Sequence, residues 1–167
     1  MPDSRAVCVV DTSVLVDMHV GGLLRVVFDL PLLLVTPDVL LAELQEPDSV
    51  TLAALGLMPI EMSSADVREV YRLATLGRGP SINDLFALVT AKKLGATLLT
   101  GDRHLREMAE REGVGVHGTL WLVDEMVRLA VAPSVLVAQA LERMLERGSR
   151  LPVHECHKRI ELWRLAR

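Results

Sequence analysis

Four acidic residues interrupt otherwise apolar segments of this chain: Asp11, Glu43, Asp84 and Asp102. Asp11 directly follows the apolar run 6–10, and Asp102 follows the run 96–101. Both runs predict short buried strands that lead straight into helices. In an open parallel sheet, ligands bind at the carboxyl ends of the strands. Carboxylates gathered there repel one another unless a cation lies between them, and Mg²⁺ and Mn²⁺ prefer such oxygen ligands. The pattern therefore predicts a hard-metal site.

Three of these acids also fit an ordinary structural role. Asp11 and Asp102 stand just before predicted helices, where a carboxylate can cap the free backbone N–H groups. Thr12 and Ser13 can cap the first helix equally well, which leaves Asp11 without an obvious capping duty, whereas for Asp102 capping and catalysis are equal alternatives. Asp84 follows a serine by three residues, which is the capping-box spacing. That role is compatible with binding a ligand.

Glu43 is the acid for which helix capping gives no explanation. The residues at 39–42 and 44 are apolar, and they cover most directions around the predicted helix. Glutamate is almost never fully buried without a partner, because burying an unpaired charge is costly. No lysine or arginine lies within one helical turn of Glu43. We therefore expect Glu43 to face a cleft or a metal ion.

Strand and helix patterns alternate along the chain, which predicts an α/β domain with a parallel sheet of four to five strands flanked by helices. The predicted strands cover residues 6–10, 32–35, 57–62, 97–100 and 114–117. The predicted helices cover 12–18, 23–28, 38–46, 64–76, 81–94 and 103–112, followed by C-terminal helices at 120–130, 134–147 and 154–165. Asp38 is the expected N-cap of the third helix, and Gly95 the expected C-terminal cap after residue 94.

Composition limits the class of protein. The 167 residues suffice for one domain with a real core, and half of them are apolar. A net charge of −4 argues against a broadly electrostatic nucleic-acid binder but leaves room for a local basic rim. The two cysteines form neither a disulfide pattern nor a zinc motif, and no signal peptide or membrane-spanning stretch is evident. These features predict a cytoplasmic protein.

Four segments of the chain resemble the PIN-domain nucleases, which include the VapC-like toxins of toxin–antitoxin pairs. The matching segments are residues 10–15, 37–44, 81–84 and 100–105. The resemblance implies a three-layer fold, with a nuclease domain over residues 1–118 and a helical extension over 119–167 packed on the same domain. It also implies that the four acids bind one or two Mg²⁺ or Mn²⁺ ions and hydrolyse single-stranded or structured RNA. The groups implied to orient the carboxylates are Thr12, Ser13, Asn83 and Thr100.

RNA binding requires cations near the acids. The candidates are Arg78, in a glycine-bounded loop, and Arg103 and His104, which follow Asp102 at the start of a helix. Arg106 follows in the same helix, but a solvated surface charge is the better explanation for it. The free N–H groups of a helix N-terminus also attract phosphate. The alternative is that these side chains are solvated surface charges. The five Phe, Trp and Tyr rings are scattered, so the sequence predicts no general stacking platform for single strands.

Other classes of protein fit less well. A haloacid-dehalogenase-type phosphatase requires a second aspartate at position 13, where this chain has serine. A signalling receiver domain requires an acidic pair and a lysine, and this chain has neither at the required positions. A non-catalytic PIN-like module for nucleic-acid binding or regulation stays open. The mean hydropathy of +0.33 is high for a small monomer, so we expect a homodimer or an antitoxin-type protein partner.

Overall fold

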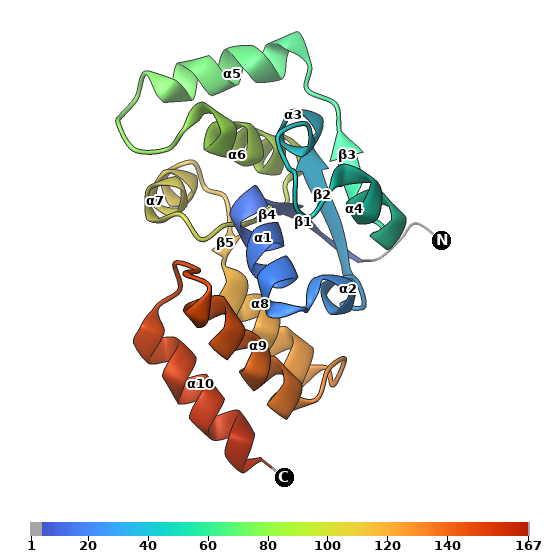
Figure 1. The fold of residues 1–167 in the computed structure, drawn as a ribbon. Coiled ribbons are helices and arrows are strands. Elements are labelled where there is room, and N and C mark those ends of the chain that lie inside the picture. Colours follow the sequence, from blue (N-terminus) through green and yellow to red (C-terminus); the bar gives the residue numbers. More distant parts are fainter. Residues whose placement is uncertain (1–4, 167) are drawn as a thin grey trace.

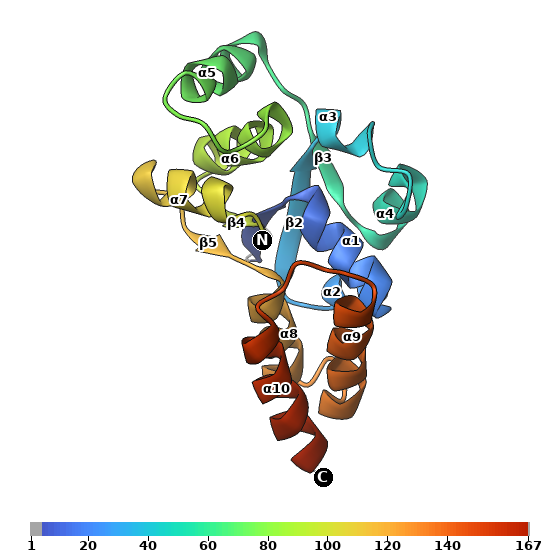
Figure 2. The same ribbon diagram turned by 60° about the vertical axis from the view of Figure 1, so that its left-hand side comes forward.

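The computed structural model describes residues 5–166, which form a three-layer α/β fold (Figures 1 and 2). Five parallel strands make one sheet in the order β3-β2-β1-β4-β5. Their bounds are β1 Ala6–Val10, β2 Leu32–Pro37, β3 Met58–Ile60, β4 Thr97–Leu99 and β5 Val116–His117. The predicted fold class and all five predicted strands are confirmed. Residues 1–4, part of the stretch from which the absence of a signal peptide was predicted, lie outside the described residues.

The sheet order changes direction at β1, which pairs with β2 on one side and with β4 on the other. The chain first builds β2 and β3 outward from one edge of β1 and then returns to build β4 and β5 on the other. At such a switch point the connections leave in opposite directions, so a crevice opens at the carboxyl ends of the two central strands. Here those ends belong to β1 and β4.

Ten helices connect or extend these strands in the described part of the chain. Their bounds are α1 Thr12–Gly21, α2 Leu24–Val27, α3 Asp38–Leu41, α4 Ser49–Leu55, α5 Ser64–Ala74, α6 Ile82–Leu94, α7 Arg103–Arg111, α8 Thr119–Arg128, α9 Ser134–Glu146 and α10 Val153–Leu165. Figure 2 shows α6 and α7 on one side of the sheet and α1 on the other. None of the helices in residues 5–166 has the length and apolar character needed to cross a membrane.

Alternating side chains of the strands divide the core into two parts. Cys8 and Val10 of β1 pack with α1 and the C-terminal helices, whereas Val9, between them, packs with α6 and α7. This follows from the two-residue period of a strand, which sends successive side chains to opposite faces. Both faces are covered, which explains why the strand sequences are continuously apolar.

The predicted helix over 38–46 is wrong. The helix α3 ends at Leu41, and Pro37 occupies the N-cap position, so Asp38 is the first helical residue rather than the cap. Pro47 argues only against the predicted end at Glu46, because the residue before a proline is disfavoured in helical conformation. Asp48 then caps α4, which the sequence analysis did not identify; its Oδ1 accepts a hydrogen bond from the Thr51 N–H at 2.9 Å.

The helix ends around the second half of the sheet follow local chemistry. Ser81 and Asp84 form the predicted reciprocal capping box at the start of α6. Gly95 ends α6 with a φ of +59°, a left-handed conformation that favours glycine, as predicted. These short-range interactions fix where α6 begins and ends, and therefore where Asp84 lies relative to the sheet.

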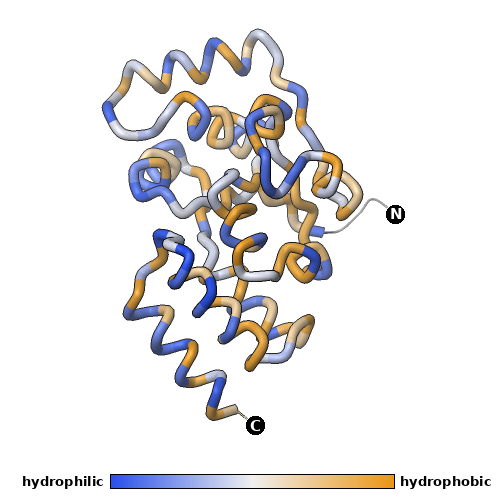
Figure 3. The backbone as a smooth tube through the Cα atoms, viewed as in Figure 1, coloured by the Kyte–Doolittle hydropathy of each residue, from blue (hydrophilic) through white to orange (hydrophobic). Residues whose placement is uncertain are grey.

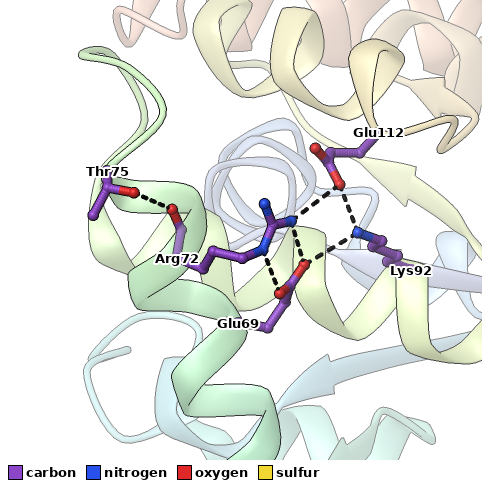
Figure 4. Close-up of polar contacts among 5 residues, drawn as sticks. All are labelled: Glu69, Arg72, Thr75, Lys92 and Glu112. Atoms are coloured by element: carbon purple, nitrogen blue, oxygen red, sulfur yellow. Dashed lines mark hydrogen bonds and ion pairs between the residues drawn. The ribbon is translucent and has the colours of Figure 1, made fainter.

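An ion-pair network joins the helices on the α6 side of the sheet (Figure 4). The Lys92 Nζ of α6 lies 3.1 Å from Glu69 Oε1 of α5 and 2.6 Å from Glu112 Oε2 at the end of α7. Arg72 pairs with the same Glu69, and hydrogen bonds from Arg72 and Lys92 lower the pKa of Glu69 to about 2. Lys92 therefore links three helices while its side chain stays 39% exposed. Single exposed pairs stabilise little, so this network mainly fixes helix orientation.

The three C-terminal helices pack onto the α1 side of the fold. Hydrophobic and hydrophilic residues alternate along α10 (Figure 3), whose buried residues are Cys156, Ile160 and Trp163. Arg159 of α10 forms a two-bonded ion pair with Asp124 of α8, at 2.7 and 2.8 Å. Both cysteines are free and buried, as the sequence predicted. The helices α8–α10 therefore share the core that α1 and β1 bury.

Candidate active site

Asp11 lies at the switch point of the sheet. Its N–H donates to the Leu99 carbonyl oxygen at 2.9 Å, which continues the β1–β4 ladder. It occupies the N-cap position of α1, yet its side chain forms no capping hydrogen bond. Instead, Oδ2 accepts hydrogen bonds from Ser13 Oγ at 3.1 Å and Thr100 Oγ1 at 2.9 Å. The carboxylate is thus held toward the crevice rather than toward its own helix.

Thr100 fixes this orientation from the end of β4. The side chain is fully buried, and its Oγ1 accepts a hydrogen bond from the Asp102 N–H at 3.1 Å. Because that N–H is already the donor, the hydroxyl proton is directed to Asp11. Thr100 was predicted to orient a carboxylate, and its position matches that role.

Asp11 lies in an electrostatically unfavourable environment. Only 4% of the residue is exposed, and this burial raises the pKa of its carboxyl above the ordinary value. The hydrogen bonds from Thr100 and Ser13 oppose the rise, while the negative charge of Asp84 adds to it. A cation placed between the two carboxylates would relieve both the burial and the repulsion.

Asp84 and Asp102 both perform the capping roles that the sequence left open. Asp84 Oδ2 accepts the Ser81 N–H at 2.7 Å, and Asp102 Oδ1 accepts the Leu105 N–H at 2.7 Å. Each capping bond uses one of two carboxylate oxygens. Capping and ligand binding are therefore compatible at both residues, and the caps hold the carboxylates in fixed positions at the helix N-termini.

Three of the four predicted acids line one pocket of about 470 Å³, together with Thr12 and Ser13. Its acidic residues from the predicted set are Asp11, Asp84 and Asp102. The chemistry of this donor set fits a hard divalent cation. However, no three His, Cys, Asp or Glu side chains of residues 5–166 stand close enough together to form a ready metal-ligand cluster. The acids line one pocket, but they do not stand close enough together to form a complete set of metal ligands.

Glu43 does not behave as predicted. It is exposed and does not line the pocket, because α3 ends at Leu41 and leaves Glu43 in the following turn. The argument from burial was therefore wrong. Glu43 Oε2 accepts a hydrogen bond from Asn83 Nδ2 at 2.5 Å, and Asn83 precedes Asp84 in α6. Glu43 is thus connected to the rim of the site through Asn83 alone.

The predicted RNA-binding residues lie around the start of α7. A Cβ at Gly79 would lie 2.9 Å from His104 Cβ, so the loop that carries Arg78 packs against His104. Arg78 itself is exposed. Arg103 pairs with Glu107 at 2.9 Å, and its side chain is 86% exposed. None of these three predicted residues is among those that line the acidic pocket.

The structure adds residues to the site that the sequence analysis missed. Asp17 of α1 is buried and lines the same pocket, and its Oδ2 accepts a hydrogen bond from Thr119 Oγ1 at 2.8 Å. Burial raises the pKa of Asp17, while hydrogen bonds from Ser149 and Thr119 oppose the rise. An acid between Val16 and Met18 was a signal available in the sequence. Arg147 and Arg150, from the loop between α9 and α10, also line the pocket and gave no such signal.

Comparison with known families gives one match. The family model described as a PIN domain matches residues 7–164, which includes the three C-terminal helices. No curated protein sequence matches the chain. The matched span contains every acid and hydroxyl of the pocket described above.

Proposed function

Because this chain belongs to the PIN-domain family, a family of nuclease-type fold, we propose that it is a metal-dependent endoribonuclease that hydrolyses RNA phosphodiester bonds. The observation that carries the proposal is Asp11, a 4% exposed carboxylate at the switch point of the sheet, beside the negative charge of Asp84. Structural carboxylates buried to this extent usually pair with a cation or saturate their hydrogen bonds. Asp11 instead faces a pocket that other acids line.

We infer that Asp11, Asp84 and Asp102 hold Mg²⁺ or Mn²⁺, and that Glu43 contributes from the rim. When bound, the ion supplies an activated water and stabilises negative charge on the leaving oxygen. The hydroxyls of Thr100 and Ser13 orient Asp11 through Oδ2. Such supporting hydrogen bonds tune both the affinity of a ligand carboxylate and its direction.

The cations around the pocket are suited to the phosphates of the substrate. Arg147 and Arg150, from the α9–α10 loop, line it. Guanidinium groups bind phosphate oxygens with two parallel hydrogen bonds, so they fix the backbone of an RNA strand as well as attract it. Arg78, Arg103 and His104 remain the proposed contacts on the α7 side.

The substitution Asp11→Asn tests the proposal. It keeps the shape of the side chain but removes the charge, so we expect metal-dependent RNA cleavage to fall by at least about 100-fold with an unchanged circular dichroism spectrum. Cleavage of a labelled RNA is measured with Mg²⁺, with Mn²⁺ and with EDTA. Asp29→Asn, an exposed aspartate at the amino end of β2, is the matched control and should keep full activity.

Cleavage that persists in EDTA, or full activity of Asp11→Asn, contradicts the proposal. RNA binding without any cleavage favours the second candidate, a non-catalytic PIN-like module for nucleic-acid binding or regulation. A specific observation supports that candidate: the acids of residues 5–166 form no closed ligand cluster.

The finer parts of the proposal concern the cellular role. They comprise action as a VapC-like toxin in the cytoplasm, a homodimer, and neutralisation by an antitoxin-type partner. Growth arrest on expression of the wild-type chain, but not of Asp11→Asn, would support the toxin role.

A further inference from the structure

A second pocket of about 370 Å³ adjoins the acidic one, and Gly101 and Arg150 line both. Its lining residues come from three segments: the start of α7, the junction of β5 with α8, and the loop between α9 and α10. Its volume falls in the range typical of small-molecule sites, roughly 300–1,000 Å³. A chain that passes over the acids can therefore continue into this second pocket.

Two aromatic rings line the second pocket. His117, at the end of β5, stacks on Trp121, in the first turn of α8, with ring centroids 4.3 Å apart and planes within 6°. Burial and the nearby charge of Arg106 lower the pKa of His117 from its ordinary 6.5, which keeps the ring neutral at pH 7. The sequence analysis expected no stacking platform, because it counted only Phe, Trp and Tyr rings. A neutral stacked pair of this kind offers a flat surface to a further planar ring.

The charged side chains that line the second pocket are all positive. Its described lining contains Arg103, Arg106 and Arg150 and no aspartate or glutamate, although the chain as a whole carries a net charge of −4. Arg103 is already paired with Glu107, but the side chains of Arg106 and Arg150 form no hydrogen bond or ion pair with another residue in the range 5–166. Both therefore have donors available for an anion.

Gly118 makes room for one of these arginines. A Cβ at this position would lie 3.3 Å from Arg106 Nη2 and 3.3 Å from the Thr100 carbonyl oxygen. The arginine thus extends along the backbone between the two strand ends, and its guanidinium reaches the pocket beside Thr100. The same Thr100 orients Asp11 in the first pocket, so the two pockets share one structural element.

We propose that the second pocket binds a single unpaired nucleotide of the RNA, next to the bond that is cleaved. Its base extends the His117–Trp121 stack, and its phosphate binds Arg106 and Arg150. This inference rests on the proposed ribonuclease function and specifies its substrate class, because a base inside a duplex is already stacked on both faces. The preferred substrate is therefore RNA that is single-stranded at the cleavage site.

Tryptophan fluorescence tests the stacking directly. The chain has two tryptophans, so Trp163→Phe leaves Trp121 as the only one. We expect the RNA hexanucleotide A₆, titrated in EDTA, to quench Trp121 fluorescence, and a blunt RNA duplex to leave it unchanged. Trp121→Phe, which retains the buried Trp163, should show no quenching. If Trp163→Phe does not fold, the difference between the unmodified protein and Trp121→Phe gives the same readout.

Fluorescence anisotropy with labelled A₆ tests the phosphate contacts. We expect Arg106→Ala and Arg150→Ala to weaken binding about tenfold, and each to reduce the slope of log K against log salt by about 1. Arg68→Ala is the matched control, because Arg68 is an exposed arginine on α5, far from the pocket. It should leave both the affinity and the slope unchanged.

EDTA separates this test from the test of catalysis. Absence of A₆ binding, binding without quenching of Trp121, or equal losses for Arg150→Ala and Arg68→Ala would each overturn the nucleotide site. Metal-dependent cleavage accompanied by any of these results leaves the ribonuclease intact and removes only this subsite. Quenching by A₆ in a protein that never cleaves RNA retains the nucleotide site and overturns the nuclease proposal.

Discussion

The buried carboxyl of Asp17 shows how one residue can join distant parts of this fold. It lies on α1, whereas its hydrogen-bond donors Thr119 and Ser149 come from α8 and from the loop after α9. Hydrogen bonds from hydroxyls compensate only partly for the loss of water around a charge, so the pKa of Asp17 stays above its ordinary 3.8. The folded protein therefore binds this proton more tightly than the unfolded chain does.

The raised pKa of Asp17 predicts how the substitution Asp17→Asn changes stability with pH. Between pH 3.8 and the raised folded-state pKa, the parent protein loses stability as the pH rises, because folding then requires burial of a charge. Asparagine has no charge to bury. We expect the unfolding temperature of the variant, relative to that of the parent, to increase as the pH rises from 3 to 8, as measured by calorimetry. The control Asp29→Asn should show no such trend, and a relative loss of stability of Asp17→Asn at high pH would disprove the account.

At the scale of secondary structure, the contact between α1 and α9 depends on a glycine. Gly21 is the last residue of α1, and its carbonyl oxygen accepts a hydrogen bond from Arg143 Nη2 at 2.6 Å. A Cβ at this position would overlap the terminal methyl of Met144 and lie 3.4 Å from the Ala140 carbonyl oxygen. A side chain at this position would therefore have to displace the buried end of Met144.

We therefore predict that Gly21→Val destabilises the protein by about 1–3 kcal/mol, since the added side chain overpacks the contact around the buried Met144. Urea denaturation followed by circular dichroism measures the effect. Gly77→Ala is the control, because nothing lies within 4 Å of a Cβ there and the residue is exposed. If the two variants unfold at the same urea concentration, the proposed closeness of α1 and α9 is wrong.

At the scale of the whole molecule, the C-terminal helices complete the core and the site together. Val14 and Met18 of α1 share one buried cluster with Leu122 of α8, Leu141 of α9 and Ile160 of α10. The same helices place Arg147 and Arg150 at the acidic pocket. The division into a nuclease domain over 1–118 and an extension over 119–167 packed on the same domain stays a prediction.

Truncation after residue 118 tests whether the first segment folds alone. We expect the fragment 1–118 to lose cooperative unfolding and to bind a hydrophobic dye, because removal of α8–α10 exposes one face of the β1 and α1 core. Thermal unfolding and dye fluorescence of the fragment and the full chain are compared at equal concentration. A fragment that unfolds cooperatively without dye binding would establish residues 1–118 as an independent domain.

Much of the fold could be predicted from the sequence because its causes are local. The apolar runs identified all five strands, and Ser81, Asp84 and Gly95 identified both ends of α6. The prediction failed between residues 41 and 49: α3 ends at Leu41, well before Pro47, and Asp48 caps a further helix, α4. As a result, Glu43 was predicted to lie in a buried helix, whereas it lies in an exposed turn.

The sequence by itself determined the parallel α/β architecture and the acids at the strand ends, because strand runs and helix caps depend on residues a few positions apart. Only the tertiary structure decided which of these acids meet. The strand order around β1 brings Asp11 and Asp102 together, and the packing of the C-terminal helices adds Asp17 and Arg150. Such contacts join residues up to 139 positions apart, as between residues 11 and 150, and no short-range pattern encodes which distant surfaces pack against each other.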